Sequence, residues 1–392
     1  MAFTFIDLFS GIGGFHLALK KLGGKCVFAS EIDQNAVNVY KDNFDMEVHG
    51  DITKIDLSTI PYADFLAGGF PCQSFSKAGY QNGFSDKTKG TLFFNIKEIL
   101  SYFVQKNKPI KYILLENVKN LTTHNKQDTW NTIIKTLKSL GYIVHDYPMI
   151  MSPTDLDISI PQSRDRVYIY GIHESYSKKL PNIEFTKKNK NNADLFASNI
   201  LELKVDKKYI LDNDKVQLIR MWQEFLDNIN FKPSFPVWGN YFRYPSNNPE
   251  NAPDWKLRII SRNQEFYQEY KTFIDNWAHK YDFWNLKPTF QKLEWQCQED
   301  CTKLNETILQ FRPSGLRAKK PTFVPALVAI SQIPVIYYQN NYRKLTPREC
   351  ARLQSFPDSF KISSNDTQAY KQFGNTVNVG VVEYIAKRLL EV

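Results

Sequence analysis

The chain has 392 residues, 42% of them hydrophobic, which is enough to fill one large core and a smaller one, so we expect two domains. Its N-terminal residues lack the basic and long apolar stretches of a secretory signal, and no apolar run is long enough to span a membrane, which predicts a soluble, cytoplasmic protein. The net charge of +9 suits a polyanionic partner, although codon bias in an Asn- and Ile-rich chain would supply the same lysines.

Residues 3–171 alternate short apolar runs with amphipathic helical stretches. The runs are FTFIDLF, KCVFAS, ADFLAGGF, YILLENV and RVYIYGI, and the helical stretch TWNTIIKTLKSLG lies between the last two. Strands that alternate with helices in this order form βαβ units. We therefore expect an α/β fold whose mainly parallel sheet carries helices on both faces.

A glycine-rich turn follows the first of these runs. Gly11, Gly13 and Gly14 stand between FTFIDLF and the helical segment HLALKKLG. A strand, a glycine turn and a helix N-terminus are the usual cradle of a nucleotide cofactor, because the missing Cβ atoms let the backbone approach the ligand. Taken alone, such a turn is also compatible with tight packing and no ligand.

Acidic residues near the next strand ends favour a cofactor that contains adenosine. Glu31 ends the second strand about 20 residues after the first glycine, where it is placed to accept hydrogen bonds from two ribose hydroxyls. Asp51 follows a further short strand and is placed to bind an adenine amino group, with Ile32 and Ile52 as apolar walls. His16 stands where a dinucleotide fingerprint has its third glycine, so the sequence favours S-adenosylmethionine over a nicotinamide cofactor.

A cysteine and a carboxylate mark the predicted catalytic edge of the sheet. Cys72 follows ADFLAGGF and Pro71, and Glu116 ends YILLENV, so we expect both at the carboxyl ends of parallel strands, where open α/β sheets place active sites. Each also has a simpler interpretation, because a cysteine after a strand is often a buried small hydrophobe and a carboxylate there can merely cap the strand.

A thiol and a carboxylate beside a methyl donor suit methylation of cytosine at C5. Cys72 would add to C6 while Glu116 serves N3, which makes C5 nucleophilic enough to take up the methyl group. Loss of the C5 proton and expulsion of Cys72 would then restore aromaticity. Arg164 and Arg166, two residues apart in QSRDR, would lie on one side of an extended segment and could contact a carbonyl or a phosphate. The alternative for this run is a solvated strand edge.

The regular alternation is lost between about residues 176 and 343, where we predict a second domain. It holds every tryptophan except Trp130, and residues 255–284 interleave basic and aromatic side chains. Such a stretch suits DNA contact, but we expect most of the tryptophans to form the core of this domain. Cys297 and Cys301 lack a second cysteine or histidine pair that would complete a zinc site, so we interpret them as helix-surface thiols. Five cysteines without paired spacing also argue against disulfides.

Residues 344–392 return to strong helical patterning. LTPRECARLQSF and NTVNVGVVEYIAKRLL both predict amphipathic helices, and their apolar faces need a large partner. We expect this C-terminal segment to pack back on residues 1–175.

Together these motifs resemble the DNA cytosine-5 methyltransferase family of bacterial restriction–modification systems. The similarity covers the chain apart from its second domain and lies in DLFSGIGGF, GGFPCQSFS, KGTLFFNI, LLENV, PQSRDRVYI, LTPRECARLQSFP and FGNTVNVG, which stand in the family's order. It implies a Rossmann-like, S-adenosylmethionine-dependent methyltransferase domain and a smaller target recognition domain at residues 176–343.

The resemblance also implies roles for individual residues. The cofactor contacts would be Phe9, Gly11, Ile12, Gly14, Glu31, Ile32, Asp51, Ile52, Pro71, Leu92 and Asn375. The flipped cytosine would be surrounded by Cys72, Glu116, Gln162, Arg164 and Arg166. The implied substrate is double-stranded DNA, bound by a monomer without a metal, and a cognate restriction endonuclease would act on the same DNA sequence.

Two alternatives share this catalytic frame. A transfer-RNA cytosine-5 methyltransferase would use the same residues, but the large second domain and the PCQSFS segment favour DNA. A DNA-binding relative without activity would need neither Cys72 nor Glu116, and both are present.

Overall fold

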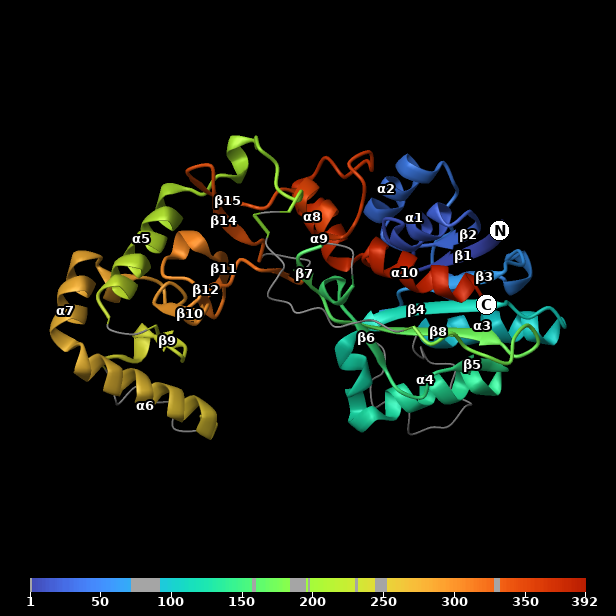
Figure 1. The fold of residues 1–392 in the computed structure, drawn as a ribbon, viewed down its shortest axis with the longest axis horizontal. Coiled ribbons are helices and arrows are strands. Elements are labelled where there is room, and N and C mark those ends of the chain that lie inside the picture. Colours follow the sequence, from blue (N-terminus) through green and yellow to red (C-terminus); the bar gives the residue numbers. More distant parts are fainter. Residues whose placement is uncertain are drawn as a thin grey trace. The chain divides into compact units, whose positions relative to one another are not determined.

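The computed structural model describes residues 2–71, 92–156, 160–183, 195–196, 198–229, 232–243, 252–327 and 332–392. The chain folds into two compact units (Figure 1). Unit 1 comprises Met1–Ala193, Ala326–Ile330 and Cys350–Val392, and unit 2 comprises Asp194–Pro325 and Ser331–Glu349. The main divisions thus fall after residues 193 and 349, whereas the sequence pattern placed them after residues 175 and 343.

Unit 1 is built on a seven-stranded sheet in the order β2-β1-β3-β4-β8-β5, with β6 also paired to β8. Its first four strands in space are parallel, which agrees with the expected α/β fold and mainly parallel sheet. β8 instead runs antiparallel to β4, β5 and β6. The sequence pattern did not predict this direction, because a strand buried on both faces has the same apolar run either way. The strands are β1 (Phe3–Leu8), β2 (Gly24–Ser30), β3 (Phe65–Gly68), β4 (Tyr112–Val118), β5 (Tyr142–Val144), β6 (Met149–Met151) and β8 (Arg166–His173).

Helices cover both faces of this sheet, as the alternating side chains of β1 illustrate. Ile6 and Leu8 belong to the apolar cluster that includes buried residues of α3 and α4. Phe5 points to the other face, where its ring lies 5.3 Å from that of His16 in α1. The helices are α1 (Gly14–Lys21), α2 (Gln34–Phe44), α3 (Leu92–Gln105), α4 (Asp128–Ser139), α9 (Asp366–Asn375) and α10 (Val379–Leu390).

Residues Cys350–Val392, at the C-terminal end of the chain, belong to unit 1. α10 packs against α1, and Lys21 Nζ lies 3.4 Å from Glu383 Oε2 between these helices. The α10 helix begins after Asn378, whose side chain accepts a hydrogen bond from Val381 N at 3.1 Å and so caps the helix.

Unit 2 contains a six-stranded sheet, in the order β15-β14-β11-β12-β10-β9, and its described residues also form three long α-helices. The strands are β9 (Val237–Trp238), β10 (Lys292–Gln296), β11 (Ile308–Arg312), β12 (Gly315–Lys319), β14 (Val335–Tyr338) and β15 (Asn341–Lys344). The helices are α5 (Asn213–Asp227), α6 (Asp254–Glu269) and α7 (Lys271–Lys280). The described residues also form the short strands β7 (Gln162–Ser163) and β13 (Val324–Pro325) and the short helix α8 (Pro347–Leu353).

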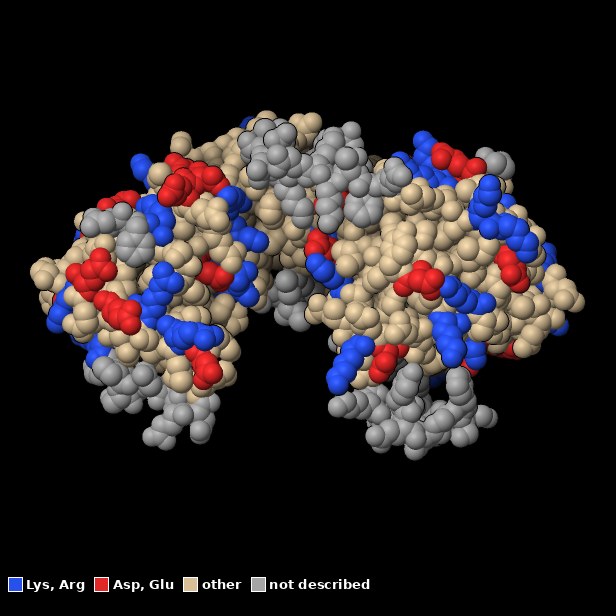
Figure 2. All heavy atoms as spheres, turned by 60° about the horizontal axis from the view of Figure 1, so that its bottom comes forward, with Lys and Arg blue, Asp and Glu red and all other residues tan. Residues whose placement is uncertain are grey.

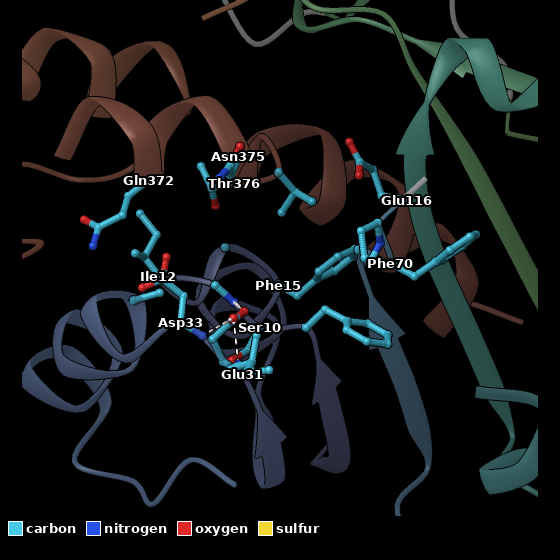
Figure 3. A pocket seen from close by; sticks show the side chains of 18 of the residues that line it. Ser10, Ile12, Phe15, Glu31, Asp33, Phe70, Glu116, Gln372, Asn375 and Thr376 are labelled. Carbon is cyan, nitrogen blue, oxygen red and sulfur yellow. Dashed lines mark hydrogen bonds between the residues drawn. The ribbon is translucent and has the colours of Figure 1, made fainter. Parts of the chain in front are cut away.

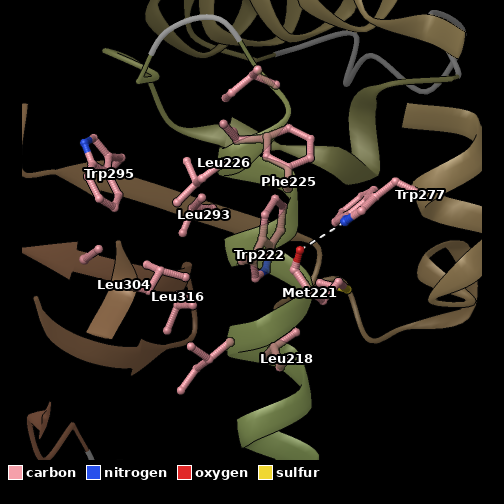
Figure 4. Close-up of a cluster of buried hydrophobic side chains, with 14 of the residues drawn as sticks. Leu218, Met221, Trp222, Phe225, Leu226, Trp277, Leu293, Trp295, Leu304 and Leu316 are labelled. Carbon is pink, nitrogen blue, oxygen red and sulfur yellow. Dashed lines mark hydrogen bonds between the residues drawn. The ribbon is translucent and has the colours of Figure 1, made fainter. Parts of the chain in front are cut away.

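Tryptophans fill the core of unit 2, as expected. Trp222, Trp277 and Trp295 are buried, and Trp277 Nε1 donates a hydrogen bond to Met221 O at 3.0 Å (Figure 4). Trp255 on α6 is the contrast, with 54% of its surface exposed. The prediction of helix-surface thiols was wrong, since Cys297 and Cys301 are buried in this core just after β10.

On the face shown in Figure 2, basic and acidic side chains are interspersed. Among the helices that the structure describes, none has the length and apolar character needed to cross a membrane.

Candidate active site

A cavity of about 610 Å³ opens in unit 1 at the carboxyl ends of β1, β2, β3 and β4 (Figure 3). The turn between β1 and α1 lines it, together with residues that follow β2 and β3, the end of β4 and the first residue of α3. Residues 371, 372 and 374–377, at the end of α9 and just after it, supply a further wall. Segments from both ends of the chain therefore build one cavity.

The turn after β1 folds tightly enough to bring α1 to this cavity. Gly11 has a φ of 53°, in the left-handed region that favours glycine, and Gly13 N donates to Ser10 O at 2.8 Å. A Cβ at Gly14 would lie only 2.7 Å from Thr376 Oγ1 and from Val377 Cγ2. The absence of a side chain at Gly14 thus allows α1 to approach the C-terminal segment closely.

Glu31 ties this turn to the end of β2. Its Oε2 accepts a hydrogen bond from Gly11 N at 2.8 Å, and its Oε1 accepts from the backbone amides of Ile32 and Asp33, both at 2.8 Å. A carboxylate offers about four acceptor positions, so three backbone partners leave room for one ligand donor and not for both ribose hydroxyls that the sequence pattern predicted. Glu31 is therefore fixed by the protein and still able to bind a hydroxyl group.

Ile32, Asp51 and Ile52 lie farther along the same wall. Ile32 is 75% exposed and lines the cavity, which is an unusual position for a large aliphatic side chain. Asp51 accepts hydrogen bonds from Thr53 N at 3.0 Å and from Thr53 Oγ1 at 2.7 Å, and these bonds lower the pKa of Asp51. Ile52 is almost fully buried beneath them.

An ion pair joins the start of α2 to α9. Lys371 Nζ lies 2.9 Å from Asp33 Oδ2, and this contact lowers the pKa of Asp33. Gln372 Nε2 also donates to Asn35 O at 3.1 Å. The sequence motifs gave no sign of these residues, since they lie outside the glycine turn and the strand-end carboxylates. Only the fold brings α9 next to the start of α2.

Glu116 marks another part of the cavity, at the end of β4. It is 8% exposed, and Arg166 Nε lies 3.0 Å from its Oε1. Burial raises the pKa of Glu116, while the positive charges of Arg166 and Arg164 oppose that rise. The ladder between β4 and β8 sets this pair, because Arg166 is in register with Val118, two residues after Glu116.

Arg164 lines the cavity too, but its partners are different. Its Nη2 donates to Gly374 O at 3.1 Å and to Thr376 O at 2.7 Å, and its backbone N donates to Ser152 Oγ at 2.8 Å. Among the described residues, its Nε and Nη1 atoms have no hydrogen-bond partner. Burial lowers the pKa of Arg164 to about 10, so the group keeps its charge at neutral pH.

Asn117 fastens the end of β3 to β4. The parallel ladder between these strands stops at Gly68 and Leu115, and beyond it Asn117 Nδ2 donates to Phe70 O at 2.7 Å. Asn117 Oδ1 accepts from Val118 N at 2.8 Å, so the orientation of the amide is unambiguous. Asn117 and Phe70 line the cavity and were not among the predicted residues, although each adjoins a predicted residue in the sequence.

The predicted site residues fall into three groups. The cavity is lined by Phe9, Gly11, Ile12, Gly14, Glu31, Ile32, Asp51, Ile52, Pro71, Leu92, Glu116, Arg164, Arg166 and Asn375. Gln162 is fully buried and does not line it. Cys72 lies outside the described residues and directly follows Pro71 in the sequence.

Comparison with known proteins gives one consistent result. The model of the family described as C-5 cytosine-specific DNA methylase matches residues 3–391. The type II methyltransferase M1.ScrFI of Lactococcus lactis subsp. cremoris is 36% identical, over 100% of this chain and 78% of that protein. The type II methyltransferase M.HpaII of Haemophilus parainfluenzae is 34% identical, over 99% of this chain and 89% of that protein.

Solved structures agree on the fold. Dnmt2 methyltransferase of S. pombe superimposes with a TM-score of 0.56 at 20% identity, covering 99% of this chain and 98% of that one. A putative DNA modification methyltransferase encoded within an E. coli prophage gives 0.55 at 21% identity, covering 99% of both chains.

Proposed function

Because this chain belongs to the C-5 cytosine-specific DNA methylase family, we propose that it methylates C5 of a cytosine flipped out of double-stranded DNA, with Cys72 as the covalent nucleophile. The enzyme is a DNA (cytosine-5-)-methyltransferase. One observation carries the assignment of the site. A single cavity contains the glycine turn with Glu31, the Glu116–Arg166 pair and Pro71, the residue before Cys72 (Figure 3).

The residues of this cavity fit S-adenosylmethionine. The exposed face of Ile32 offers an apolar wall for an adenine ring, and Asp51 lies nearby as a hydrogen-bond acceptor for its amino group. Glu31 keeps one acceptor position for a ribose hydroxyl, and the turn at Gly11 brings the backbone close. When bound, the cofactor supplies an electrophilic methyl group on its sulfonium. We therefore assign the part of the cavity that Ile32, Asp51, Glu31 and the Gly11 turn line to the adenosine of the cofactor.

Glu116 and Arg166, the charged residues around the flipped cytosine, would prepare this base for methylation. The raised pKa of Glu116 favours the protonated carboxyl, which can donate a hydrogen bond or proton to N3. This withdraws electrons from C6, where the Cys72 thiolate forms a bond and so makes C5 nucleophilic. After C5 takes up the methyl group, loss of its proton expels the thiolate. Arg166 would hold the Glu116 carboxyl in place through their 3.0 Å contact.

Unit 2 would recognise the target sequence. Its apolar core makes it a stable unit that can present surface residues to DNA, which supports this role. The curated relatives above are type II methyltransferases, which supports a role as the protective enzyme of a restriction–modification pair. A cognate endonuclease would cut the same sequence.

The proposal is tested with methyl-tritiated S-adenosylmethionine and two substrates, unmethylated genomic DNA and bulk transfer RNA. We expect label in DNA cytosines, and bisulfite sequencing of the product would reveal the recognition sequence. Label in RNA alone would contradict the DNA assignment, and label in neither substrate would favour a relative without activity.

Cys72→Ser separates chemistry from binding. The variant should lose methyl transfer and the covalent complex with DNA that contains 5-fluorocytosine, because a hydroxyl is too weakly acidic to add to C6. Cofactor binding in calorimetry should remain close to that of the parent enzyme. A variant that no longer binds the cofactor would make Cys72 a structural residue and overturn its assignment as the nucleophile.

A further inference from the structure

Arg164 holds the turn between α9 and α10. The two carbonyl groups that its Nη2 contacts, Gly374 O at 3.1 Å and Thr376 O at 2.7 Å, flank Asn375, the last residue of α9. The final carbonyls of a helix have no partner within the helix, and the helix dipole favours a positive charge at this end. The guanidinium group therefore satisfies orphan acceptors and complements the dipole at once.

The backbone of Arg164 is itself anchored. Its N–H donates to Ser152 Oγ at 2.8 Å, and Ser152 is completely buried. Arg164 is only 2% exposed. The backbone of Arg164 is thus held by Ser152, and its guanidinium group is held by the carbonyls of Gly374 and Thr376. Arg164 therefore forms a rigid link between the residues before β8 and the C-terminal segment.

The turn that Arg164 holds is a wall of the proposed cofactor site. Asn375, Thr376 and Val377 all line the cavity. Their other side meets the start of α1, where a Cβ at Gly14 would come within 2.7 Å of Thr376 and Val377. Residues 375–377 are therefore packed between the glycine turn and Arg164, which leaves them little freedom to move.

Arg166 has a separate task. Its Nε contacts Glu116 at 3.0 Å, whereas the hydrogen bonds of Arg164 go to the C-terminal carbonyls. Although the two arginines are only two residues apart, one supports the catalytic carboxyl and the other supports the C-terminal wall.

We infer that Arg164 is a positioning residue for the cofactor, which fixes the Asn375–Val377 wall, and is not primarily a contact of the flipped base. The inference rests on the proposed cofactor site. Lysine keeps the charge but has no planar fork and cannot reproduce the geometry of the guanidinium group. Arg164→Lys should therefore loosen the wall and weaken cofactor binding before any DNA is present.

The test is a calorimetric titration of the DNA-free enzyme with S-adenosylmethionine. We expect the Kd of Arg164→Lys to rise about tenfold, which corresponds to ~1.4 kcal/mol. The matched control Arg166→Lys should bind the cofactor within about twofold of the parent enzyme. If the parent enzyme fails to bind, the proposed cofactor site is wrong. If the parent binds and Arg164→Lys binds equally well while turnover falls, the positioning role is overturned and a base contact takes its place.

A second variant covers the case in which Arg164→Lys does not fold. Ser152→Ala removes the anchor of the Arg164 backbone and leaves its guanidinium group intact. It should weaken cofactor binding in the same direction but less. Hydrogen–deuterium exchange in residues 372–379 should also become faster in both variants. If Ser152→Ala changes neither the hydrogen–deuterium exchange of residues 372–379 nor the affinity for S-adenosylmethionine, the positioning role of Arg164 is contradicted.

Discussion

Glu116 illustrates how two opposing forces set the state of one side chain. Burial favours the neutral acid, while Arg166 at 3.0 Å and the nearby Arg164 favour the carboxylate. Burial is the stronger influence, so the pKa lies above its ordinary value. A carboxyl whose pKa is raised in this way holds its proton to a higher pH than an exposed one and is still held in place by a cation.

Glu116→Gln should lower kcat by about 10²- to 10⁴-fold, because an amide can donate a hydrogen bond to N3 but cannot transfer a proton. In the parent enzyme the methylation rate should fall as pH rises through the pKa of Glu116, since only the protonated acid donates. Single-turnover rates across a pH series would check both expectations. The same alkaline fall in the Gln variant would mean that another group is responsible.

His16 shows the opposite shift. Its ring stacks on Phe44 with centroids 3.9 Å apart, and its Nδ1 lies 2.6 Å from the Tyr40 hydroxyl. Burial, aided by the positive charge of Lys20, lowers the pKa of His16 to about 3. His16, which stands where a dinucleotide fingerprint has its third glycine, is thus an uncharged side chain that packs between α1 and α2.

A histidine that stays neutral when folded destabilises the protein in acid. Its folded pKa of about 3 lies below the ordinary 6.5, so its stability contribution is present above pH 6.5 and is lost as pH falls toward 3. Between pH 6.5 and 5 this loss amounts to about 2 kcal/mol. His16→Gln should lack that part of the pH dependence in urea unfolding. Equal slopes for the two proteins would refute the neutral state of His16.

At the scale of elements, the end of β4 is more than a support for Glu116. Asn117 continues the connection to β3 where the backbone ladder has ended, through its bond to Phe70 O. The Phe70 ring also packs against Phe93 of α3, with centroids 5.8 Å apart. The residues on either side of the segment that contains Cys72 are therefore anchored to the sheet and to each other.

Asn117→Asp should disturb this anchor with little change in volume. It replaces the Nδ2 donor by an oxygen that faces Phe70 O, so an attraction becomes a repulsion. We expect at least about a tenfold fall in kcat with the Kd for S-adenosylmethionine nearly unchanged. Methyl transfer and calorimetry would be measured on the same preparation. A loss confined to cofactor affinity would show that Asn117 serves the other end of the cavity.

Local sequence patterns predicted the alternating elements of unit 1, the glycine turn and the strand-end carboxylates, because these are local features. Phe9, Ile12, Pro71, Leu92 and Asn375, which also line the cavity, came only from the family resemblance. They could not place Lys371 beside Asp33 or Arg164 beside Thr376, since each pair joins segments far apart in the chain. The sequence pattern did not predict that β8 runs antiparallel to β4, because its apolar residues are compatible with either direction. The burial of Cys297 and Cys301 likewise depended on a core that no spacing reveals.

At the scale of the whole molecule, each unit has its own core. The core of unit 2 surrounds Trp222 and Trp277, while the cavity and its walls lie in unit 1. A defect in one core should therefore change the functions of the two units differently.

Trp277→Ala should destabilise unit 2 by about 3–5 kcal/mol, since it empties a buried site and removes the indole hydrogen bond to Met221 O. The matched control Trp255→Ala alters an exposed side chain and should change stability by no more than about 0.5 kcal/mol. We expect Trp277→Ala to lose DNA methylation yet retain cofactor binding in calorimetry. Loss of cofactor binding as well would show that the units are energetically coupled.

The path of the chain through unit 1 has a consequence for biosynthesis. The glycine turn is translated first, but the wall at residues 375–377 that faces it comes after the whole of unit 2. Domains generally begin to fold while the ribosome is still adding residues. A nascent chain can thus assemble most of the sheet and all of unit 2 and yet have an unfinished cofactor cavity. Premature termination just before Val379 would yield a protein that resembles the enzyme in bulk but lacks the α10 helix that packs on α1.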